Sequence, residues 1–290
     1  MKWNEWPIKK IYFEDKYYPA ILKEIKNAPK ILYYRGKLDQ KLFEKTLAIV
    51  GSRRLTRYGK MATEKLVAGL VNQKITIISG FMYGTDSEAH QKCLEYGGRT
   101  IAVLGNGLNV LYPPENEKLY TEILDKGGLI FSEYEPDLQP QLWTFPQRNR
   151  IVAGLATLGV LVIEAGEKSG SLITARLARQ QGKKVFAVPG PITSSVSVGT
   201  NLLIQNHQAK MVLSAEDILG KKLGTPTLFS QQALSPIEKK IFQALETEPL
   251  TADEISRLIA KDVIETGKTL SLMSLKNLIS DSSGKYYLNS

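Results

Sequence analysis

The feature that most constrains this 290-residue chain is a pattern repeated from residue 46 to about residue 213: an apolar strand, a polar loop and an amphipathic helix. Apolar strands gain free energy by leaving water. Their alternation with helices predicts an α/β fold with a parallel sheet, covered by helices on both faces. The predicted strands are Thr46–Val50, Ile75–Ser79, Thr100–Leu104, Leu129–Ser132, Gly159–Glu164, Lys184–Val188 and, as a seventh, Lys210–Leu213.

Small polar residues follow six consecutive predicted strands. In such sheets ligands bind beyond the carboxyl ends of the strands, where glycine leaves room and hydroxyls and amides supply donors. We therefore expect a polar, anion-tolerant cleft along one rim of the sheet. The loops that would form it contain Gly51–Ser52, Ser79–Gly80 with Gly84–Thr85–Asp86, Gly105–Asn106–Gly107, Ser132–Glu133, Ser169–Gly170–Ser171 and Gly190 with Gly199–Thr200–Asn201.

The first of these loops is the most basic. Gly51 permits a tight turn and close approach of a ligand, Ser52 adds a hydroxyl, and Arg53, Arg54 and Arg57 follow at once. A helix over about residues 59–71 should point its amino-terminal end at this turn. Free N–H groups, the helix dipole and arginine forks together suit a phosphate. The alternative is an ordinary strand-to-helix turn with solvated arginines.

The segment FPQRNR, residues 145–150, combines an aromatic ring with two arginines and an amide. Pro146 fits the first turn of a helix, which would present Phe145 just before that helix and Arg148 and Asn149 at its start. Stacking on Phe145 and phosphate contact would suit a single strand of nucleic acid. Alternatively, Phe145 is a hydrophobic staple and the arginines, Arg150 above all, pair with acidic residues at positions 133, 135 and 137.

Other polar residues favour structural roles. Asp86 and His90 lie four apart on a predicted helix without a nucleophile or metal partner, so we expect Asp86 to cap the helix and His90 to be satisfied by hydrogen bonds. Cys93 reads as a small core residue. Glu164 ends a strand and is placed to orient backbone or an arginine in the cleft. The Gly105–Asn106–Gly107 run lacks the third glycine of a dinucleotide fingerprint, which argues against a nicotinamide enzyme.

Composition narrows the class of protein. The net charge is +9, and residues 1–60 hold 15 Lys and Arg against 6 Asp and Glu, so this part of the chain carries the whole excess. Such a surplus favours a polyanion, although a solvated basic surface is the plain alternative. One cysteine and two histidines exclude an internal disulfide and make a zinc site improbable, and no cofactor is expected. Without a signal peptide or membrane span, a reducing cytoplasm is the simplest setting.

The ends of the chain form separate segments. Residues 1–45 are predicted as an extension packed on the main domain, with a helix over Tyr18–Lys26 and a strand at residues 31–34. Residues 221–234 read as a linker. A small domain over residues 235–290 then shows three helices, with N-caps at Ser235 and Thr251 and a third helix over Thr266–Ile279, followed by a turn at residues 282–284 and a hairpin. This pattern suggests a winged helix, but its 7 basic and 8 acidic residues leave duplex binding doubtful and protein docking equally open.

Taken together, these motifs resemble the DNA processing protein A family (DprA, also called Smf). They are VGSR at 50–53, SG…GTD…AH at 79–90, AVLGNGL…YP at 102–113, FPQRNRIVAGL at 145–155, VIEA…SGSLITA at 162–175 and VPG at 188–190. They stand in the order of the family and span about residues 18–220.

The resemblance implies an extended Rossmann-like three-layer domain over residues 46–220 that binds single-stranded DNA and forms a homodimer. It also implies protection of incoming DNA and loading of the RecA recombinase during natural transformation, with no bond made or broken. The resulting set of predicted DNA-binding residues is Gly51, Ser52, Arg53, Arg54, Gly80, Tyr83, Gly105, Asn106, Phe145, Arg148, Asn149, Ser169, Gly170 and Ser171.

Departures from the family leave alternatives open. The second loop reads GFMYGTD, where the family usually has an arginine at the position of Tyr83, so this residue is expected to stack on a base rather than bind phosphate. The same architecture resembles nucleoside-monophosphate phosphoribohydrolases, but eight residues separate Gly190 from Gly199–Thr200, unlike the tight loop of those enzymes. A transcription regulator acting through the winged helix is a third possibility.

Overall fold

The computed structural model describes residues 2–220, 235–275, 278–282 and 284–288. The chain divides into two compact units, Met1–Lys222 and Leu223–Ser290. The predicted linker, residues 221–234, lies outside the described residues.

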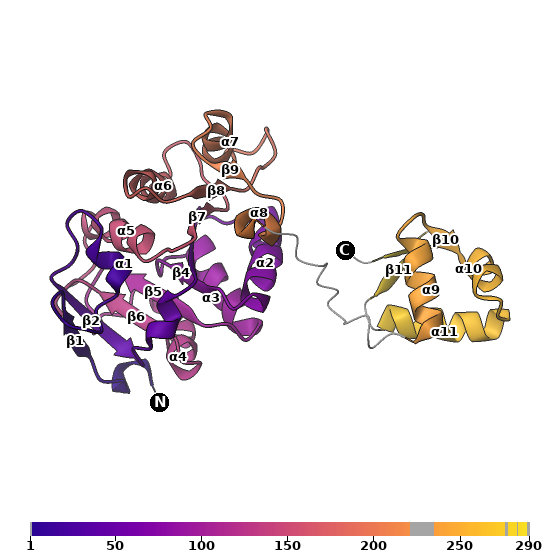
Figure 1. Cartoon of the computed structure of the whole chain (residues 1–290), viewed down its shortest axis with the longest axis horizontal. Helices are drawn as coiled ribbons and strands as arrows, with labels where there is room; N and C mark the ends of the chain where they lie inside the picture. Colours follow the sequence, from indigo (N-terminus) through magenta and orange to yellow (C-terminus); the bar gives the residue numbers. More distant parts are fainter. Residues whose placement is uncertain (1, 221–234, 276–277, 283, 289–290) are drawn as a thin grey trace. The chain divides into compact units, whose positions relative to one another are not determined.

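A nine-stranded sheet forms the centre of the first unit, in the order β1-β2-β6-β5-β4-β3-β7-β8-β9 (Figure 1). From β6 to β9 every neighbouring pair is parallel, so the predicted parallel arrangement is confirmed for seven strands. These strands are β3 (Thr46–Val50), β4 (Thr76–Ser79), β5 (Thr100–Leu104), β6 (Leu129–Ser132), β7 (Gly159–Val162), β8 (Val185–Ala187) and β9 (Lys210–Met211).

The amino-terminal segment extends this sheet. Strands β1 (Lys9–Tyr12) and β2 (Ile31–Gly36) are antiparallel to each other, and β2 pairs antiparallel with β6, Tyr33 opposite Ser132. The sheet is therefore mostly parallel, and residues 1–45 contribute two of its strands in addition to packing on it. The predicted helix at Tyr18–Lys26 shrinks to α1 (Ala20–Lys23), because Pro19 stands at its N-cap and Asn27 adopts a positive φ of 58°.

Helices cover both faces of the sheet, because side chains alternate between the two faces along each strand. On one face, a buried apolar cluster joins the strands to α1, α5 (Thr144–Gly154), α6 (Gly170–Gln180) and α7 (Val198–Gln205). On the other face, Leu94, Tyr120 and Ile123 of α3 (Thr85–Glu95) and α4 (Glu117–Asp125) pack beneath β5 and β6. Helix α2 (Arg57–Asn72) packs along α3, and α8 (Ala215–Leu219) along α2. Short 3-10 turns occur at Trp3–Glu5, Gln40–Phe43 and Pro114–Asn116.

The second unit has a small core of its own. Helices α9 (Pro236–Leu245), α10 (Ala252–Ile259) and α11 (Val263–Leu275) pack with a three-stranded antiparallel sheet of order β10-β12-β11. The predicted caps are confirmed: Ser235 accepts from the Glu238 N–H and Thr251 from the Glu254 N–H. The third helix begins earlier than predicted and ends before Ile279, which opens β11 (Ile279–Ser282). Strand β12 (Lys285–Leu288) pairs with both β11 and β10 (Leu250–Thr251), whereas Ser283 of the predicted turn lies outside the described residues.

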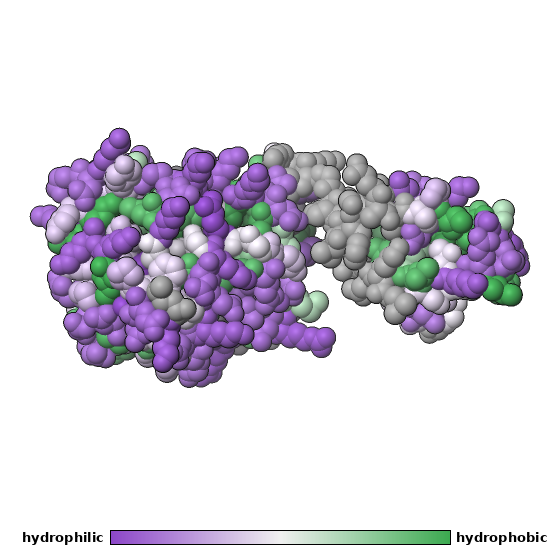
Figure 2. All heavy atoms as spheres, turned by 90° about the horizontal axis from the view of Figure 1, so that it is seen from below, coloured by the Kyte–Doolittle hydropathy of each residue, from purple (hydrophilic) through white to green (hydrophobic). Residues whose placement is uncertain are grey.

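Hydrophilic side chains dominate the face of the first unit seen in Figure 2, with apolar side chains between them, whereas hydrophilic and apolar side chains are intermixed on the visible face of the second unit. Within the described ranges, no helix combines the length and the apolar character needed to cross a bilayer.

Candidate nucleic-acid interface

A cavity of about 660 Å³ opens at the carboxyl ends of β3, β4 and β7. It is the place at which a doubly wound sheet binds its ligands. Twelve of the fourteen predicted residues line it: Gly51, Ser52, Arg53, Arg54, Gly80, Tyr83, Phe145, Arg148, Asn149, Ser169, Gly170 and Ser171. The loops after β3, β4 and β7 therefore meet around one space together with the start of α5. The expectation that all six loops form it is wrong, since Ser132–Glu133, Gly190 and Gly199–Thr200–Asn201 are not in the lining.

Gly105 and Asn106 are outside this lining. A Cβ atom on Gly105 would lie 2.7 Å from Cδ1 of Phe145, so the glycine makes room for that ring. Asn106 is fully buried, and its Nδ2 donates to the carbonyls of Gly107 and Val110. Gly105 therefore lies behind the Phe145 ring in the wall, and Asn106 holds the backbone of the loop at residues 107 and 110.

The first loop is tied to the start of α3. The Ser52 carbonyl accepts from the Thr85 N–H at 3.1 Å and from the Thr85 hydroxyl at 3.2 Å. Gly51 and Gly84 permit this approach, because a Cβ on Gly51 would lie 2.4 Å from Thr85 Oγ1 and one on Gly84 2.3 Å from the Ser52 carbonyl oxygen. The loop that carries the exposed Arg53 and Arg54 is therefore held at Ser52, where it begins.

The amino-terminal end of α2 is not available to a ligand, contrary to the expectation from the sequence. Glu164 is buried and accepts from the Thr56 N–H at 3.0 Å and from the Thr56 hydroxyl, while Thr56 itself caps α2 at Gly59. The carboxylate occupies the positive end of the helix dipole where we predicted a phosphate. The prediction that Glu164 orients backbone is confirmed.

Arg148 lies at the floor of the cavity with only 4% of its surface exposed. One Nη donates to the Val103 carbonyl and Nε donates to Oδ1 of Asn149 at 3.3 Å, both of them neutral partners. Arg148 does not pair with Glu133, Glu135 or Asp137, so that alternative is wrong for this residue. Burial lowers the pKa of the guanidinium from its usual value, opposed by the nearby charge of Asp86. An arginine nevertheless stays charged, and a buried cation is stabilised by an anion.

Asp86 accepts from the Met82 N–H at 3.3 Å, and Gly84 stands at the N-cap of α3, so the predicted capping role of Asp86 is wrong. It lines the cavity close to Arg148: a Cβ on Gly80 would lie 2.2 Å from Asp86 Oδ2 and 2.8 Å from Arg148 Nη2. Burial raises the pKa of the Asp86 carboxyl above its usual value, while the Arg148 charge opposes the rise. Among the described residues that line the cavity, Asp86 is the one acidic residue, beside Arg53, Arg54, Arg148 and Lys168.

Arg150, by contrast, pairs with an acidic residue, as the structural alternative predicted. Its Nη1 donates to Glu133 Oε2 at 2.8 Å, its Nη2 contacts the other carboxylate oxygen, and its Nε donates to the Asn27 carbonyl at 3.0 Å. It links α5 to β6 and to the amino-terminal segment and does not line the cavity.

Aromatic rings supply the apolar part of the cavity wall. Phe145 is the second residue of α5 rather than its predecessor, and its ring centroid lies 5.9 Å from that of Tyr112. The Arg53 guanidinium carbon lies 5.6 Å from the centre of the Phe145 ring, a cation–π distance that fixes the arginine over the aromatic face. Tyr83 lines the rim and donates to Glu115 Oε2 at 2.7 Å. Hydrogen bonding to Glu115 raises the pKa of the Tyr83 hydroxyl, and the ring remains 39% exposed.

The amino-terminal end of α6 faces the cavity. Ser169 is its N-cap, and its Oγ accepts from the Ser171 N–H at 3.4 Å. Gly170 has no atom within 4 Å of the position of a Cβ, so the helix end is open to a ligand. The first turn of this helix contributes Ser169, Gly170, Ser171, Ile173 and Thr174 to the lining. The helix dipole therefore adds partial positive charge beside Lys168.

Neither His90 nor Cys93 belongs to the cavity. His90 is fully buried, with Nδ1 2.6 Å from Thr100 Oγ1 and Nε2 2.7 Å from the Gly80 carbonyl oxygen, as its structural reading predicted. Burial lowers the pKa of His90 from 6.5 to about 4 and raises that of Cys93 to about 12. In the part of the chain that the structure describes, no three His, Cys, Asp or Glu side chains are grouped to hold a metal ion.

The sequence did not predict several residues that line the cavity, among them Lys168, Tyr112 and Leu142, which add a positive charge, an aromatic ring and an apolar side chain to it. Lys168 directly precedes the predicted Ser169, so its position in that loop was a usable signal. Tyr112 and Leu142 come from long connections after β5 and β6, where spacing along the chain does not report which side chains turn inward.

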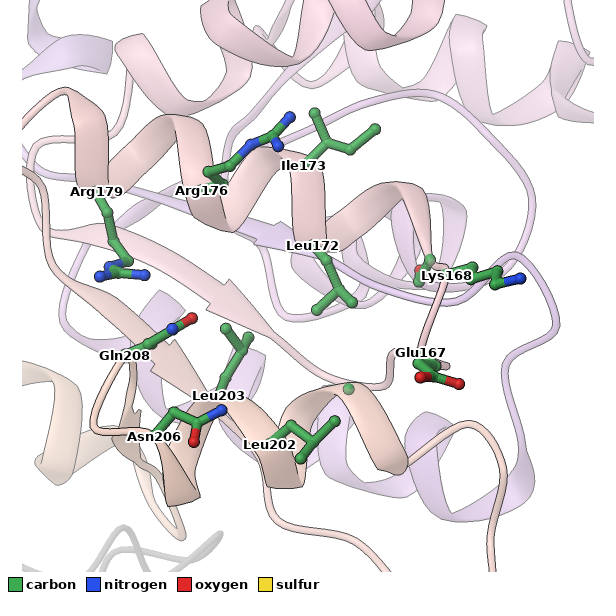
Figure 3. Close-up of a pocket in the computed structure, with 12 residues that line it drawn as sticks. Glu167, Lys168, Leu172, Ile173, Arg176, Arg179, Leu202, Leu203, Asn206 and Gln208 are labelled. Carbon is green, nitrogen blue, oxygen red and sulfur yellow. The ribbon is translucent and has the colours of Figure 1, made fainter.

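A second hollow, of about 530 Å³, adjoins the cavity between α6 and α7 and shares Lys168, Ser169 and Ile173 with it. In Figure 3, Leu172 and Leu203 point toward each other across this space, with Arg179 and Gln208 at one end and Glu167 and Lys168 at the other. Of the predicted DNA-binding residues only Ser169 lines it, and of the predicted cleft loops it also includes Gly199.

The fold and the cavity define an α/β protein with a basic, aromatic-walled site at the carboxyl ends of its parallel strands. The chain belongs to the DNA recombination-mediator protein A family, whose model matches residues 9–222. The resemblance inferred from the motifs is thereby confirmed.

Two relatives show how far the similarity extends. The DNA processing protein DprA of Streptococcus pneumoniae is 45% identical over 207 residues, which cover 71% of this chain and 72% of the relative. The protein Smf of Synechocystis sp. is 35% identical over an alignment that covers 94% of this chain and 78% of the relative.

Two solved structures share the fold. The X-ray structure of DprA from Streptococcus pneumoniae matches with a TM-score of 0.69 at 43% identity, covering 77% of this chain and 76% of that one. DprA from Helicobacter pylori, whose structure describes a single-stranded DNA binding mode, matches with a TM-score of 0.66 at 34% identity, covering 76% and 97%.

Proposed function

We propose that this protein binds single-stranded DNA in the cavity at the carboxyl ends of β3, β4 and β7. The observation that carries the proposal is Arg148: a guanidinium with 4% exposure in the lining of the cavity, hydrogen-bonded to neutral acceptors and accompanied by one carboxylate, Asp86. Because Arg53, Arg54 and Lys168 line the same space, this single carboxylate leaves an excess of positive charge, which a further anion would balance. A phosphate of the DNA backbone supplies that anion, as the comparison with the Helicobacter pylori relative also supports.

The remaining lining fits an unpaired polynucleotide. Arg53, Arg54 and Lys168 supply further positive charge, and the first turn of α6 supplies N–H groups for phosphate oxygens. Phe145 and Tyr112 offer rings on which bases stack, with Tyr83 at the rim. Backbone contacts and stacking are available to any sequence, so binding is largely independent of sequence.

Beyond DNA binding, we propose a homodimer in the cytoplasm that protects incoming DNA and loads the RecA recombinase during natural transformation. The description of the family as a recombination mediator supports this role, and we propose no catalytic step. We assign the carboxyl-terminal unit to the winged-helix class, on its three helices followed by a paired hairpin. Its balanced charge favours protein docking over duplex binding.

The test is equilibrium binding of the full-length protein to a labelled oligothymidine and to a duplex of equal length. We expect tighter binding to the single strand and a large loss in Arg53→Glu. A matched charge reversal at Arg179, which lies outside the cavity on the same unit, should have little effect. Full oligothymidine binding by Arg53→Glu would make the assignment of the cavity wrong. Release of free base from a nucleoside monophosphate would instead support the phosphoribohydrolase alternative.

A further inference from the structure

We propose that Trp143 is a second base-stacking platform, which holds a nucleotide of the bound strand just outside the cavity. The proposal rests on the DNA-binding function proposed above and extends it to a residue next to the lining. Trp143 is 58% exposed, and its neighbour Leu142, which lines the cavity, is 93% exposed. Adjacent large apolar side chains left in water at the rim of a binding site mark a surface that a ligand covers.

The indole is held in place before any ligand arrives. Trp143 stands at the N-cap of α5, and its ring meets that of Tyr134 edge to face, with centroids 5.9 Å apart and planes at 86°. The preceding turn is closed by Thr144, whose hydroxyl donates to the Gln141 carbonyl at 2.7 Å. The buried Tyr134 hydroxyl donates in turn to the Thr144 carbonyl at 3.1 Å. Stacking on a ring fixed in this way costs little conformational entropy.

Trp143 and Phe145 serve different nucleotides. Residues two apart on a helix point about 200° away from each other, since each residue advances the helix by about 100°. Phe145 lies in the lining under the Arg53 guanidinium, whereas Trp143 does not belong to the lining. A strand that stacks one base on Phe145 and then leaves the cavity past Leu142 reaches the exposed indole.

Stacking, and not phosphate binding, is the interaction available at this point. Residues 138–147 contain no Lys, Arg, Asp or Glu, so the segment that carries Trp143 brings no charge of its own to the strand. The continuity of this surface with the cavity favours the DNA strand over a partner protein as its occupant.

The experiment compares full-length wild type with Trp143→Ala and Trp143→Phe, using a labelled oligothymidine and an abasic oligomer of equal length. Loss of one stacked base should weaken oligothymidine binding by roughly 5- to 150-fold in Trp143→Ala. Trp143→Phe should retain most of the affinity because it keeps an aromatic face. The dependence of binding on salt should be the same in all three proteins, since no phosphate contact is lost.

The abasic oligomer separates stacking from a general effect on the fold. It has no base to stack, so Trp143→Ala should bind it as wild type does. Oligothymidine should also quench the tryptophan fluorescence of wild type more than that of Trp143→Phe. Equal oligothymidine affinity and equal quenching in wild type and both variants would overturn the proposal for Trp143 alone. If wild type itself failed to bind oligothymidine, the proposed function would be refuted instead.

Discussion

The number of cations around the cavity sets how strongly salt should oppose DNA binding. Four basic side chains line it: Arg53, Arg54, Arg148 and Lys168. Each phosphate neutralised on a single strand contributes about −0.7 to the slope of log affinity against log salt concentration, because condensed counterions are released. If each of the four contacts one phosphate, the slope for wild type is about −3.

Replacing Arg53 by alanine removes one of these contacts. Arg53 is well suited to the test, because its exposed guanidinium is positioned by the Phe145 ring and its loss leaves no buried group without a partner. The slope should become shallower by about 0.7, and the affinity at low salt should fall.

The measurement is fluorescence anisotropy of a labelled oligothymidine, titrated with wild type and variant at a series of KCl concentrations. Arg179→Ala is the matched control, since Arg179 is an exposed arginine of the same unit that lines only the second hollow. The reasoning is refuted if Arg53→Ala keeps the slope of wild type, or if Arg179→Ala changes the slope as much.

Three further predictions follow from the described contacts. Gly80→Ala should weaken oligothymidine binding by about tenfold or more, because the added Cβ would displace the side chains of Asp86 and Arg148. This factor corresponds to the loss of one charge-assisted hydrogen bond. Unchanged affinity would show that the placement of these two side chains is unimportant for binding. Arg150→Met should lower the free energy of unfolding by roughly 1–3 kcal/mol, since it breaks the ion pair with Glu133, and should leave the affinity for DNA unchanged. Urea titration measures the stability and fluorescence anisotropy the affinity. A folded variant that has lost affinity would contradict the structural role of Arg150. His90 has a folded pKa of about 4, below its unfolded value of 6.5, so its stabilising effect is complete above pH 6.5 and is lost as the pH falls toward 4. That loss is on the order of 3 kcal/mol, and urea titrations at both ends of this range should show it in wild type but not in His90→Gln; equal pH dependence in the two proteins would disprove it.

Much of the fold could be predicted from the sequence because short apolar runs indicate which strands are buried. The run Thr46–Val50 and five of its six counterparts are apolar and lie near a glycine, which marks strands buried on both faces. The sixth counterpart, β9, is short and exposed. Strand β1 carries no such signal, because only Ile11 of it is buried. Strand β2 was predicted at residues 31–34, but nothing in its sequence shows that it pairs antiparallel with β1 and β6. The antiparallel edge of the sheet therefore emerged only from the structure.

For the cavity, too, some features could be predicted from the sequence and others could not. The loops at the strand ends and the segment 145–150 predicted half of its lining, since topology brings strand ends together. Spacing along the chain could not distinguish Arg148, which turns into the cavity, from Arg150, which turns to Glu133. Nor could it reveal that Glu164 from a distant strand occupies the positive end of α2. These contacts depend on which side chains lie close together in the folded protein, and spacing along the chain does not show that.

The central claim is that one basic cavity holds the backbone of an unpaired DNA strand. A crystal structure of the protein with bound oligothymidine tests it most directly. The account predicts a phosphate within hydrogen-bonding distance of Arg148 and a second beside Arg53, with a base against Phe145. A strand bound across another surface, leaving the Arg148 guanidinium without a phosphate, would contradict it.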